Sequence, residues 1–323
     1  LKCASARGSI VHRPGRLSSR VVPTMFSGRS QPLCSLDLET PRRGASSKGL
    51  VRFRNWCNMA AFLLNFSISY SSLSGAYGLA NADVSAKYQT LLTPARWTFT
   101  IWSVIFFSEG VAMGAQLLPR YRDCELVVAS SVWWQLTCLC QVLWTIAFTR
   151  EAIAVSVVCM FGILTCLIGM AMQVDALSLG FDAYVLLRMP FALHMSWVAC
   201  QSVVNVNVLA DAYGNPPSTL LAVAIVSLVA ISCFVTIFTV AMEHPEPLVP
   251  FVAALALGGV GRELTEAARL RSNERFNPHM WPEEVILGMR SSAVALNAAC
   301  GFAFIAAVAL LARKLRAARR CKA

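Results

Sequence analysis

Charged side chains are scarce in this sequence, and their scarcity limits the classes of protein to which it can belong. Asp, Glu, Lys and Arg make up 14% of its 323 residues and hydrophobic residues make up 56%, whereas soluble domains carry about 25% charged residues. The mean hydropathy is +0.58. So few polar side chains cannot cover the surface of a water-soluble fold of this length. The composition therefore excludes a soluble enzyme and predicts an integral membrane protein.

Catalytic, nucleotide-binding and metal-binding motifs are missing as well. The sequence contains no Walker loop, no G-x-S-x-G, no H-E-x-x-H and no G-x-G-x-x-G between a strand and a helix. Most of the 12 cysteines lie in apolar stretches, where cysteine behaves as a small hydrophobic residue. Cys138 and Cys140 would point about 200° apart on a helix, which is too far to share one metal ion. We therefore expect no enzymatic activity, no disulfide framework and no metal.

Basic residues are concentrated at the two ends of the chain. Residues 1–50 hold nine Lys or Arg against two acids, and residues 313–323 hold six against none. Charge at the ends of a membrane protein reports its orientation, so the net charge of +11 does not indicate a nucleic-acid partner. Two interpretations of residues 1–50 stand, because their Ser-, Arg- and Pro-rich composition fits both an organellar transit peptide and a disordered basic tail.

Seven apolar segments approach the length of about 20 residues that a transmembrane helix needs. They are residues 56–76, 97–118, 126–148, 152–173, 184–210, 219–242 and 292–312. The first is the least apolar, because it contains Asn58, Asn65 and several serines. A shorter segment, residues 247–260, is an eighth candidate. Eight spans would place both basic ends on one side of the membrane, so the positive-inside rule favours eight over seven.

Polar side chains at membrane depth are the candidate functional groups, because they are costly there unless they face the interior of the bundle. Glu109 shares one helix face with Trp102, and His194 shares another with Asn205. Two interpretations are open for Glu109: an interhelical bond, with Arg188 as the predicted partner, or contact with a ligand or a proton in a cavity. His194 is likewise either a hydrogen-bonding group between helices or a ligand contact.

Three blocks of sequence carry motifs that point to one family. Residues 90–107, TLLTPARWTFTIWSVIFF, contain a Thr-Pro-Ala motif followed by Phe and Ile-Trp. Residues 140–148, CQVLWTIAF, place Gln141 three residues before a Trp, and residues 185–209, VLLRMPFALHMSWVACQSVVNVNVL, begin with Arg-x-Pro-Phe. In their order and spacing these blocks resemble the tryptophan-rich sensory protein family, the TspO/MBR or translocator protein group. Compact members differ in having a double proline where only Pro94 stands here.

The resemblance implies an all-α fold, a polytopic transmembrane helix bundle with a five-helix TspO-like core and two or three additional helices. The core would occupy residues 51–213, the additional helices residues 214–312, and a basic tail residues 313–323. Members of the family bind tetrapyrroles and, in some cases, sterols in a pocket between the helices beneath the first loop. The resemblance and the intramembrane polar residues together predict these ligand-binding residues: Pro94, Trp97, Phe99, Trp102, Glu109, Gln141, Trp144, Arg188, Phe191, His194, Trp197 and Asn205.

Three functions stand as hypotheses. The first is the binding, transport or sensing of a hydrophobic ligand such as a porphyrin, another tetrapyrrole or a sterol, enclosed by tryptophans beneath residues 75–95. The second is a structural or accessory subunit of an organellar membrane complex. The third is a proton-coupled transporter of a small metabolite, suggested by Glu109 and His194. We expect a plastid or mitochondrial membrane, with the lipid bilayer, a hydrophobic ligand and a homodimer or larger complex as partners.

Overall fold

The computed structural model describes residues 45–175, 180–269 and 280–320, which form helices and connecting loops without a strand. Most of the predicted basic tail, residues 1–44, lies outside the described residues. The long helices are α1 (Ala45–Ser72), α3 (Ile101–Ala115), α4 (Glu125–Thr149), α5 (Ile153–Val174), α7 (Met189–Ala212), α8 (Pro217–Thr236), α9 (Leu248–Arg269) and α10 (Glu283–Arg320). Shorter helical segments are α2 (Asn81–Lys87), η1 (Arg96–Thr100), α6 (Phe181–Ala183), η2 (Tyr184–Arg188) and η3 (Ile237–Ala241). The predicted all-α bundle is confirmed.

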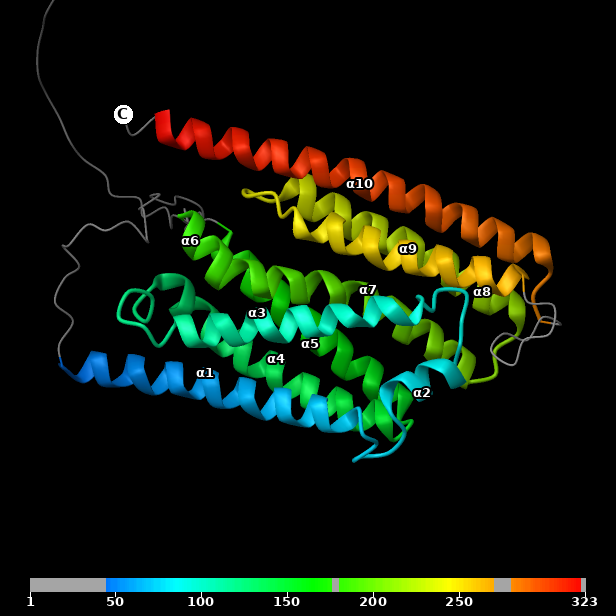
Figure 1. Cartoon of the computed structure of the whole chain (residues 1–323), viewed down its shortest axis with the longest axis horizontal. Helices are drawn as coiled ribbons and strands as arrows, with labels where there is room; N and C mark the ends of the chain where they lie inside the picture. The colour runs from blue at the N-terminus through cyan, green and yellow to red at the C-terminus, as the bar shows by residue number, and fades with distance from the viewer. Residues whose placement is uncertain (1–44, 176–179, 270–279, 321–323) are drawn as a thin grey trace, which may run out of the picture.

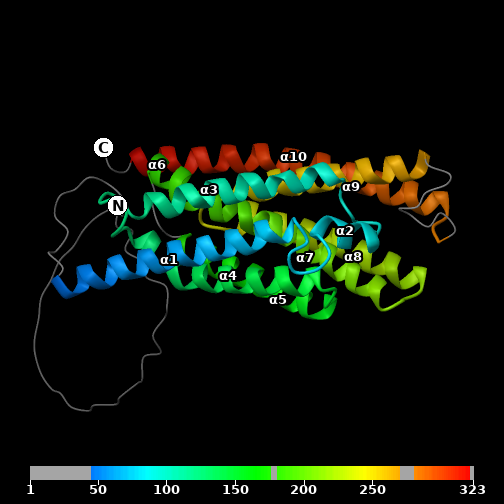
Figure 2. The ribbon, with the colours of Figure 1, turned by 60° about the horizontal axis from the view of Figure 1, so that its bottom comes forward.

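Five of the long helices close into a ring. α3 packs on α1, α1 on α4, α4 on α5, α5 on α7, and α7 returns to α3. The other three form a layer against one side of this ring, because α8 and α9 both pack on α7 and α10 packs on α9 (Figures 1 and 2). The ring corresponds to the predicted five-helix core, and the layer supplies three additional helices.

Both ends of the helical region lie at the same end of the bundle. α1 begins, and α10 ends, at the left of Figure 1. We call this the terminal end, and we call the opposite end, which carries the connection from α1 to α3, the loop end. Among the described residues, seven helices are long and apolar enough to cross a membrane, and α1 is an eighth long helix beside them. The chain is an integral, multi-pass membrane protein.

α1 is less apolar than the other long helices because asparagines occupy its inward face. Asn58 and Asn65 are buried, whereas Leu64 on the outward face is exposed. Asn58 Nδ2 donates hydrogen bonds to Gln116 Oε1 of the α3–α4 connection at 3.0 Å and to Ser131 Oγ of α4 at 2.9 Å. Hydrogen bonds and close packing, rather than the hydrophobic effect, hold helices together in lipid. The asparagines that weaken the hydropathy of α1 therefore attach it to the ring.

Two predicted spans differ from the helices that form. The segment at residues 247–260 becomes α9, a helix of 22 residues, because the chain stays helical through its polar continuation. The segment at residues 292–312 is the middle of α10, which has 38 residues and continues through most of the predicted basic tail. The apolar stretch therefore marks only the part of each helix that suits lipid, while the helix itself extends further.

The connection from α1 to α3 is hydrogen-bonded to α9 at the loop end. The backbone N–H of Ala95 donates to the carbonyl of Gly259 in α9 at 3.1 Å. A Cβ at Gly259 would lie 2.3 Å from Thr98 Cγ2, so only glycine permits this approach. Leu91 and Leu92, in the same connection, are buried. The first loop therefore fills the loop end of the ring with its own side chains.

Candidate functional site

The interior of the ring holds a fully buried acid–base pair. His194 Nδ1 on α7 lies 2.6 Å from Glu109 Oε1 on α3, and both side chains are 0% exposed. The predicted alternative pairing of Glu109 with Arg188 is therefore wrong. Glu109 Oε2 and His194 Nε2 have no hydrogen-bond partner among the described residues. An acceptor oxygen and a ring nitrogen are thus left available in the interior.

Aromatic rings pack around this pair on the loop-end side. Trp102 of α3 lies edge-on to His194 with ring centroids 5.5 Å apart, and Phe99 of η1 lies edge-on to Trp197 of α7 at 5.8 Å. Edge-to-face pairs of this kind contribute about 0.5–1.5 kcal/mol beyond the area they bury. The structure therefore brings five of the predicted residues, including Glu109, into one cluster built by η1, α3 and α7.

Gln141 and Asn205 connect neighbouring helices. Gln141 Oε1 on α4 accepts a hydrogen bond from Asn65 Nδ2 on α1 at 3.1 Å. Asn205 Nδ2 on α7 donates to Ser156 Oγ on α5 at 3.0 Å. All four of these side chains are buried. Each amide has a partner within the protein, so both residues hold the ring closed.

The remaining predicted tryptophans do not stack on one another. Trp144 stacks on Phe148 of its own helix, with ring centroids 5.2 Å apart. Trp97 is 50% exposed, and Pro94 is buried in the loop next to the position that a Cβ of Gly259 would occupy. These residues contribute to the loop end of the ring and do not enclose a common space with Trp102.

Arg188 lies in an ionic network at the terminal end. Its Nε donates to Glu246 Oε2 at 3.3 Å, and its Nη2 lies 3.5 Å from Asp175 Oδ1. The Tyr184 hydroxyl donates to Glu246 Oε1 at 2.8 Å. Burial raises the pKa of Glu246 above its ordinary value, and the neighbouring Arg188 charge and the Tyr184 hydrogen bond oppose this rise. The guanidinium is therefore balanced by acids from the ends of α5 and η3.

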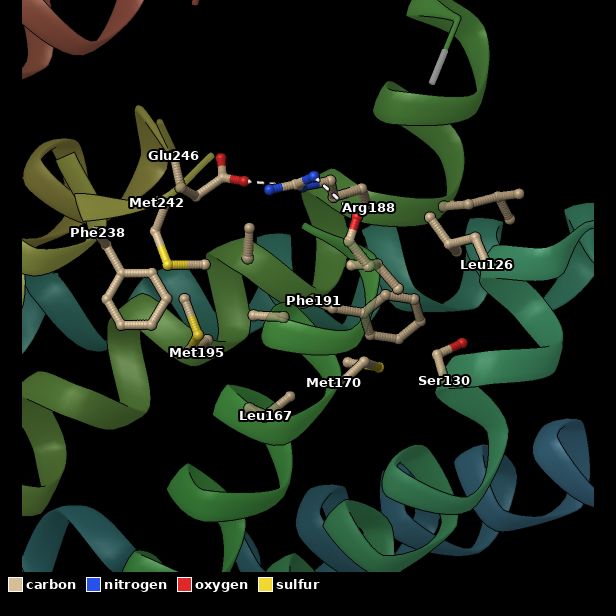
Figure 3. A pocket seen from close by; sticks show the side chains of 14 residues that line it. Leu126, Ser130, Leu167, Met170, Arg188, Phe191, Met195, Phe238, Met242 and Glu246 are labelled. Atoms are coloured by element: carbon tan, nitrogen blue, oxygen red, sulfur yellow. Dashed lines mark hydrogen bonds and ion pairs between the residues drawn. The ribbon is translucent and has the colours of Figure 1, made fainter. Parts of the chain in front are cut away.

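An apolar pocket of about 420 Å³, which includes its open mouth, lies beside this network between α4, α5, α7 and η3. We call it the α5–α7 pocket. Its walls include Leu167, Met170, Phe191, Met195, Phe238 and Met242. In Figure 3, Arg188 and Glu246 lie along one edge, and the apolar side chains extend away from them. The pocket thus has an apolar body and one charged edge.

A smaller pocket, whose volume of about 240 Å³ also includes its open mouth, lies inside the ring, and we call it the second pocket. α1, α3, α4 and α7 line it, and its polar walls come from Asn58, Gln116 and Ser130. Phe191 lines both pockets and packs edge-on against Trp134, with ring centroids 5.0 Å apart. The two pockets are therefore neighbours with the Phe191 ring as a shared wall.

Both pockets lie at the terminal end, opposite the first loop. Leu126, in the first turn of α4, lines each of them, whereas Leu79 of the first loop binds the carbonyl of Thr149 at the last turn of α4. Of the predicted site residues, Arg188 and Phe191 line the α5–α7 pocket. The family resemblance implies a pocket beneath the first loop, whereas these two pockets lie at the opposite end of the bundle.

Several pocket residues were not among the predicted ones. The wall formed by Met170, Met195, Phe238 and Met242 consists of ordinary apolar residues within predicted spans, so no sequence signal marks them. Glu246 does carry a signal, since it is an acid between two apolar segments and close to the membrane. Among the described residues, no group of three or more His, Cys, Asp or Glu is placed to hold a metal ion.

The comparisons with known proteins agree with this architecture. The profile of the family described as TSPO-like protein matches residues 55–271, which is about two thirds of the chain and extends from α1 through α9. No curated protein and no solved structure matches the chain. The matched region contains the ring except for the first ten residues of α1, together with the Glu109–His194 pair and both pockets. The chain therefore belongs to the TSPO-like protein family.

Proposed function

We propose that this protein binds a hydrophobic small molecule within the membrane, and that the α5–α7 pocket is its binding site. The observation that carries the proposal is the combination of an apolar body with one charged edge formed by Arg188 and Glu246. Ligand pockets typically have apolar walls and contain a few polar groups that fix orientation. The α5–α7 pocket fits each of these features.

The side chains of the pocket walls can adjust to the shape of a ligand. Met170, Met195 and Met242 line the pocket, and methionine side chains adapt to irregular apolar surfaces. The ring of Phe191 offers a flat face for stacking against a planar ligand. A tetrapyrrole or a sterol, the two ligand classes that the family resemblance implies, would place its apolar body against these side chains and a polar group at Arg188.

The pocket supports binding rather than chemical conversion. Arg188 and Glu246 are bonded to each other, and Ser130 is the hydroxyl among the lining residues. Ser130 donates its hydrogen bond to the carbonyl of Val127 at 3.4 Å, so no lining base activates it as a nucleophile. We accordingly assign recognition of the ligand, and no catalytic step, to this site.

The test fills the pocket. Ala171→Phe adds a ring to its wall, and Val158→Phe adds the same ring to the exposed face of the same helix. Protein in lipid nanodiscs is titrated with protoporphyrin IX, followed by tryptophan fluorescence, and separately with radiolabelled cholesterol. We expect Ala171→Phe to weaken binding of whichever probe binds by at least about tenfold, or about 1.4 kcal/mol, and Val158→Phe to leave it unchanged.

Two results would contradict the proposal. If neither probe binds the native protein, the proposal that it binds a hydrophobic ligand of the implied classes is wrong. Equal binding by the native protein and a monodisperse Ala171→Phe variant would place the ligand elsewhere. In the second case, Trp102→Ala with Trp197→Ala tests the aromatic cluster around His194 as the alternative site.

We also propose a plastid or mitochondrial membrane as the location, from the composition of residues 1–50. A fluorescent protein carrying residues 1–50 at its amino terminus is offered to isolated mitochondria and chloroplasts. Import with shortening of the fusion supports a transit peptide, and exclusion from both organelles contradicts the assignment.

A further inference from the structure

Within the described part of the chain, Glu109 and His194 have no ion-pair partner other than each other. From α4 the Cys138 thiol lies within electrostatic range of Glu109, and from α1 the uncharged Asn65 lies beside that thiol. Trp102 covers the imidazole of His194. The nearest described ion pair on α7, at Arg188, is six residues away, or about 9 Å along the helix. The pair must therefore reach neutrality by itself.

One proton decides the net charge of this pair. With a carboxylate on Glu109 and a neutral imidazole on His194 the pair carries one negative charge, which is costly in a water-free interior. Adding a single proton makes it neutral, either as imidazolium and carboxylate or as imidazole and carboxylic acid. In both forms a hydrogen bond bridges Oε1 and Nδ1, consistent with their separation of 2.6 Å. The site is thus built to hold one additional proton.

The second pocket lies one helical turn from this pair. Its lining residue Met113 follows Glu109 by four positions on α3, and its lining residue Phe191 precedes His194 by three on α7. Both spacings correspond to one helical turn, or about 5.4 Å. The pair is therefore one turn deeper than the lining residues on both helices that carry it.

The walls of the second pocket suit water. Asn58, Gln116 and Ser130 provide amide and hydroxyl groups on its sides. Buried water in proteins occupies sites where two to four polar groups converge, and these three side chains converge on the second pocket. Glu109 Oε2 and His194 Nε2, which have no described partner, belong to residues one turn deeper on α3 and α7.

We propose that the Glu109–His194 pair is a proton-binding site that takes up and releases one proton through the second pocket, toward the terminal end of the bundle. In uptake, an O–H bond of a hydronium ion in the pocket breaks and an O–H or N–H bond forms on the pair, with no change in oxidation state. Release follows the reverse path. The assignment is independent of the hydrophobic ligand, which occupies the other side of Phe191.

Infrared difference spectroscopy in nanodiscs, with the pH stepped, tests the site directly. We expect a titrating band from the pair, either the carbonyl stretch of a carboxylic acid or a ring mode of the imidazolium, that disappears or shifts in frequency in both Glu109→Gln and His194→Gln. Glu246→Gln, which removes another buried acid at the terminal end, should leave the band unchanged. A spectrum in which neither Glu109→Gln nor His194→Gln alters any titrating band overturns the proposal. If Glu109→Gln does not fold, His194→Gln still tests the proposal, because it retains the Glu109 carboxyl.

Hydrogen–deuterium exchange of that band tests the route. Val127→Phe narrows the second pocket without lining the α5–α7 pocket, and Leu139→Phe changes an exposed position on the same helix. We expect Val127→Phe to slow exchange about tenfold, equivalent to a barrier higher by about 1.4 kcal/mol, and Leu139→Phe to exchange as the native protein does. Exchange unaffected by Val127→Phe overturns the route through the second pocket.

Discussion

Asn65 on α1 donates a hydrogen bond to Gln141 on α4, with 3.1 Å between nitrogen and oxygen and both side chains buried. Two turns earlier on α1, Asn58 accepts a hydrogen bond from Gln135 of α4 at 2.8 Å. The same face of α1 therefore contacts α4 through amides at two depths. Since lipid provides no hydrophobic drive for α1 to join the ring, these bonds hold it in place.

Asn58→Leu should destabilise the protein although it makes α1 more apolar. The substitution removes bonds to Gln116, Ser131 and Gln135 and leaves those groups buried without this partner. We expect a loss of at least about 1–3 kcal/mol in unfolding free energy, measured by denaturant titration in detergent. Leu64→Ala, on the exposed face, should change little. Equal stability of Asn58→Leu and native protein would contradict the role of the amides.

Gly259→Ala should displace the first loop from α9. The added Cβ would lie 2.3 Å from Thr98 Cγ2, and overpacking of this kind costs about 1–3 kcal/mol. Thr98→Ser removes that methyl group and keeps the hydroxyl that donates to the Ala95 carbonyl. Combined with Gly259→Ala it should therefore restore part of the stability, and Thr98→Ser alone is measured beside the double variant. Gly301→Ala, which meets nothing within 4 Å, is the control. Thermal unfolding of the four variants measures the effect, and absence of rescue would exclude this contact as its cause.

Arg188→Met should be more damaging than the removal of both charges. The single variant leaves Glu246 buried without its cation, and loss of one partner of a buried pair costs about 3–5 kcal/mol. Adding Glu246→Gln removes the uncompensated charge, so the double variant should be the more stable of the two. Denaturant titration of both single variants and the double variant provides the coupling energy. If the double variant is no more stable than Arg188→Met, the uncompensated charge in Arg188→Met is not that of Glu246.

The contact between Lys87 and Glu151 should make the attachment of the first loop depend on pH. The hydrogen bond from Lys87 lowers the pKa of Glu151 below its ordinary value of 4.5, and the same bond raises the pKa of Lys87 above 10.5. The stabilisation is thus present between these ordinary values, and it is lost as the pH falls through the pKa of Glu151 or rises through that of Lys87.

The measurement is the difference in melting temperature between the native protein and Glu151→Gln as a function of pH. We expect a constant difference near neutral pH that shrinks at both acidic and strongly alkaline pH. Glu284→Gln, an exposed acid at the start of α10, provides the matched control. A difference that grows toward acidic pH would show that the sign of this coupling is reversed.

The helices were largely predictable because the thickness of a bilayer sets the length of an apolar segment. Their ends were not. α9 continues beyond its apolar stretch, where Arg262 and Glu266 form an i,i+4 ion pair at 2.8 Å, and such pairs support a helix outside lipid. Hydropathy measures compatibility with lipid, so it cannot detect a helix that continues into polar surroundings.

The Glu109–His194 contact was predictable in its residues and not in its pairing. Glu109 and His194 stand out as costly polar groups, but their meeting depends on how α3 and α7 are rotated about their axes. The partner of Arg188 lies 58 residues away, between two apolar segments, and no periodic pattern connects them. The position of the pockets was beyond sequence reasoning, because Leu91 and Leu92 fill the loop end with residues that look no different from lipid-facing ones.

The length of α10 makes its end a suitable site for a fusion partner. Its 38 residues extend about 57 Å, whereas the hydrocarbon core of a bilayer is about 30 Å thick. Its basic final turns therefore extend beyond the apolar stretch at the terminal end. A soluble helical protein fused in register to Arg320 would be carried at a fixed angle and would serve as a fiducial for electron cryomicroscopy of the 35.1 kDa chain.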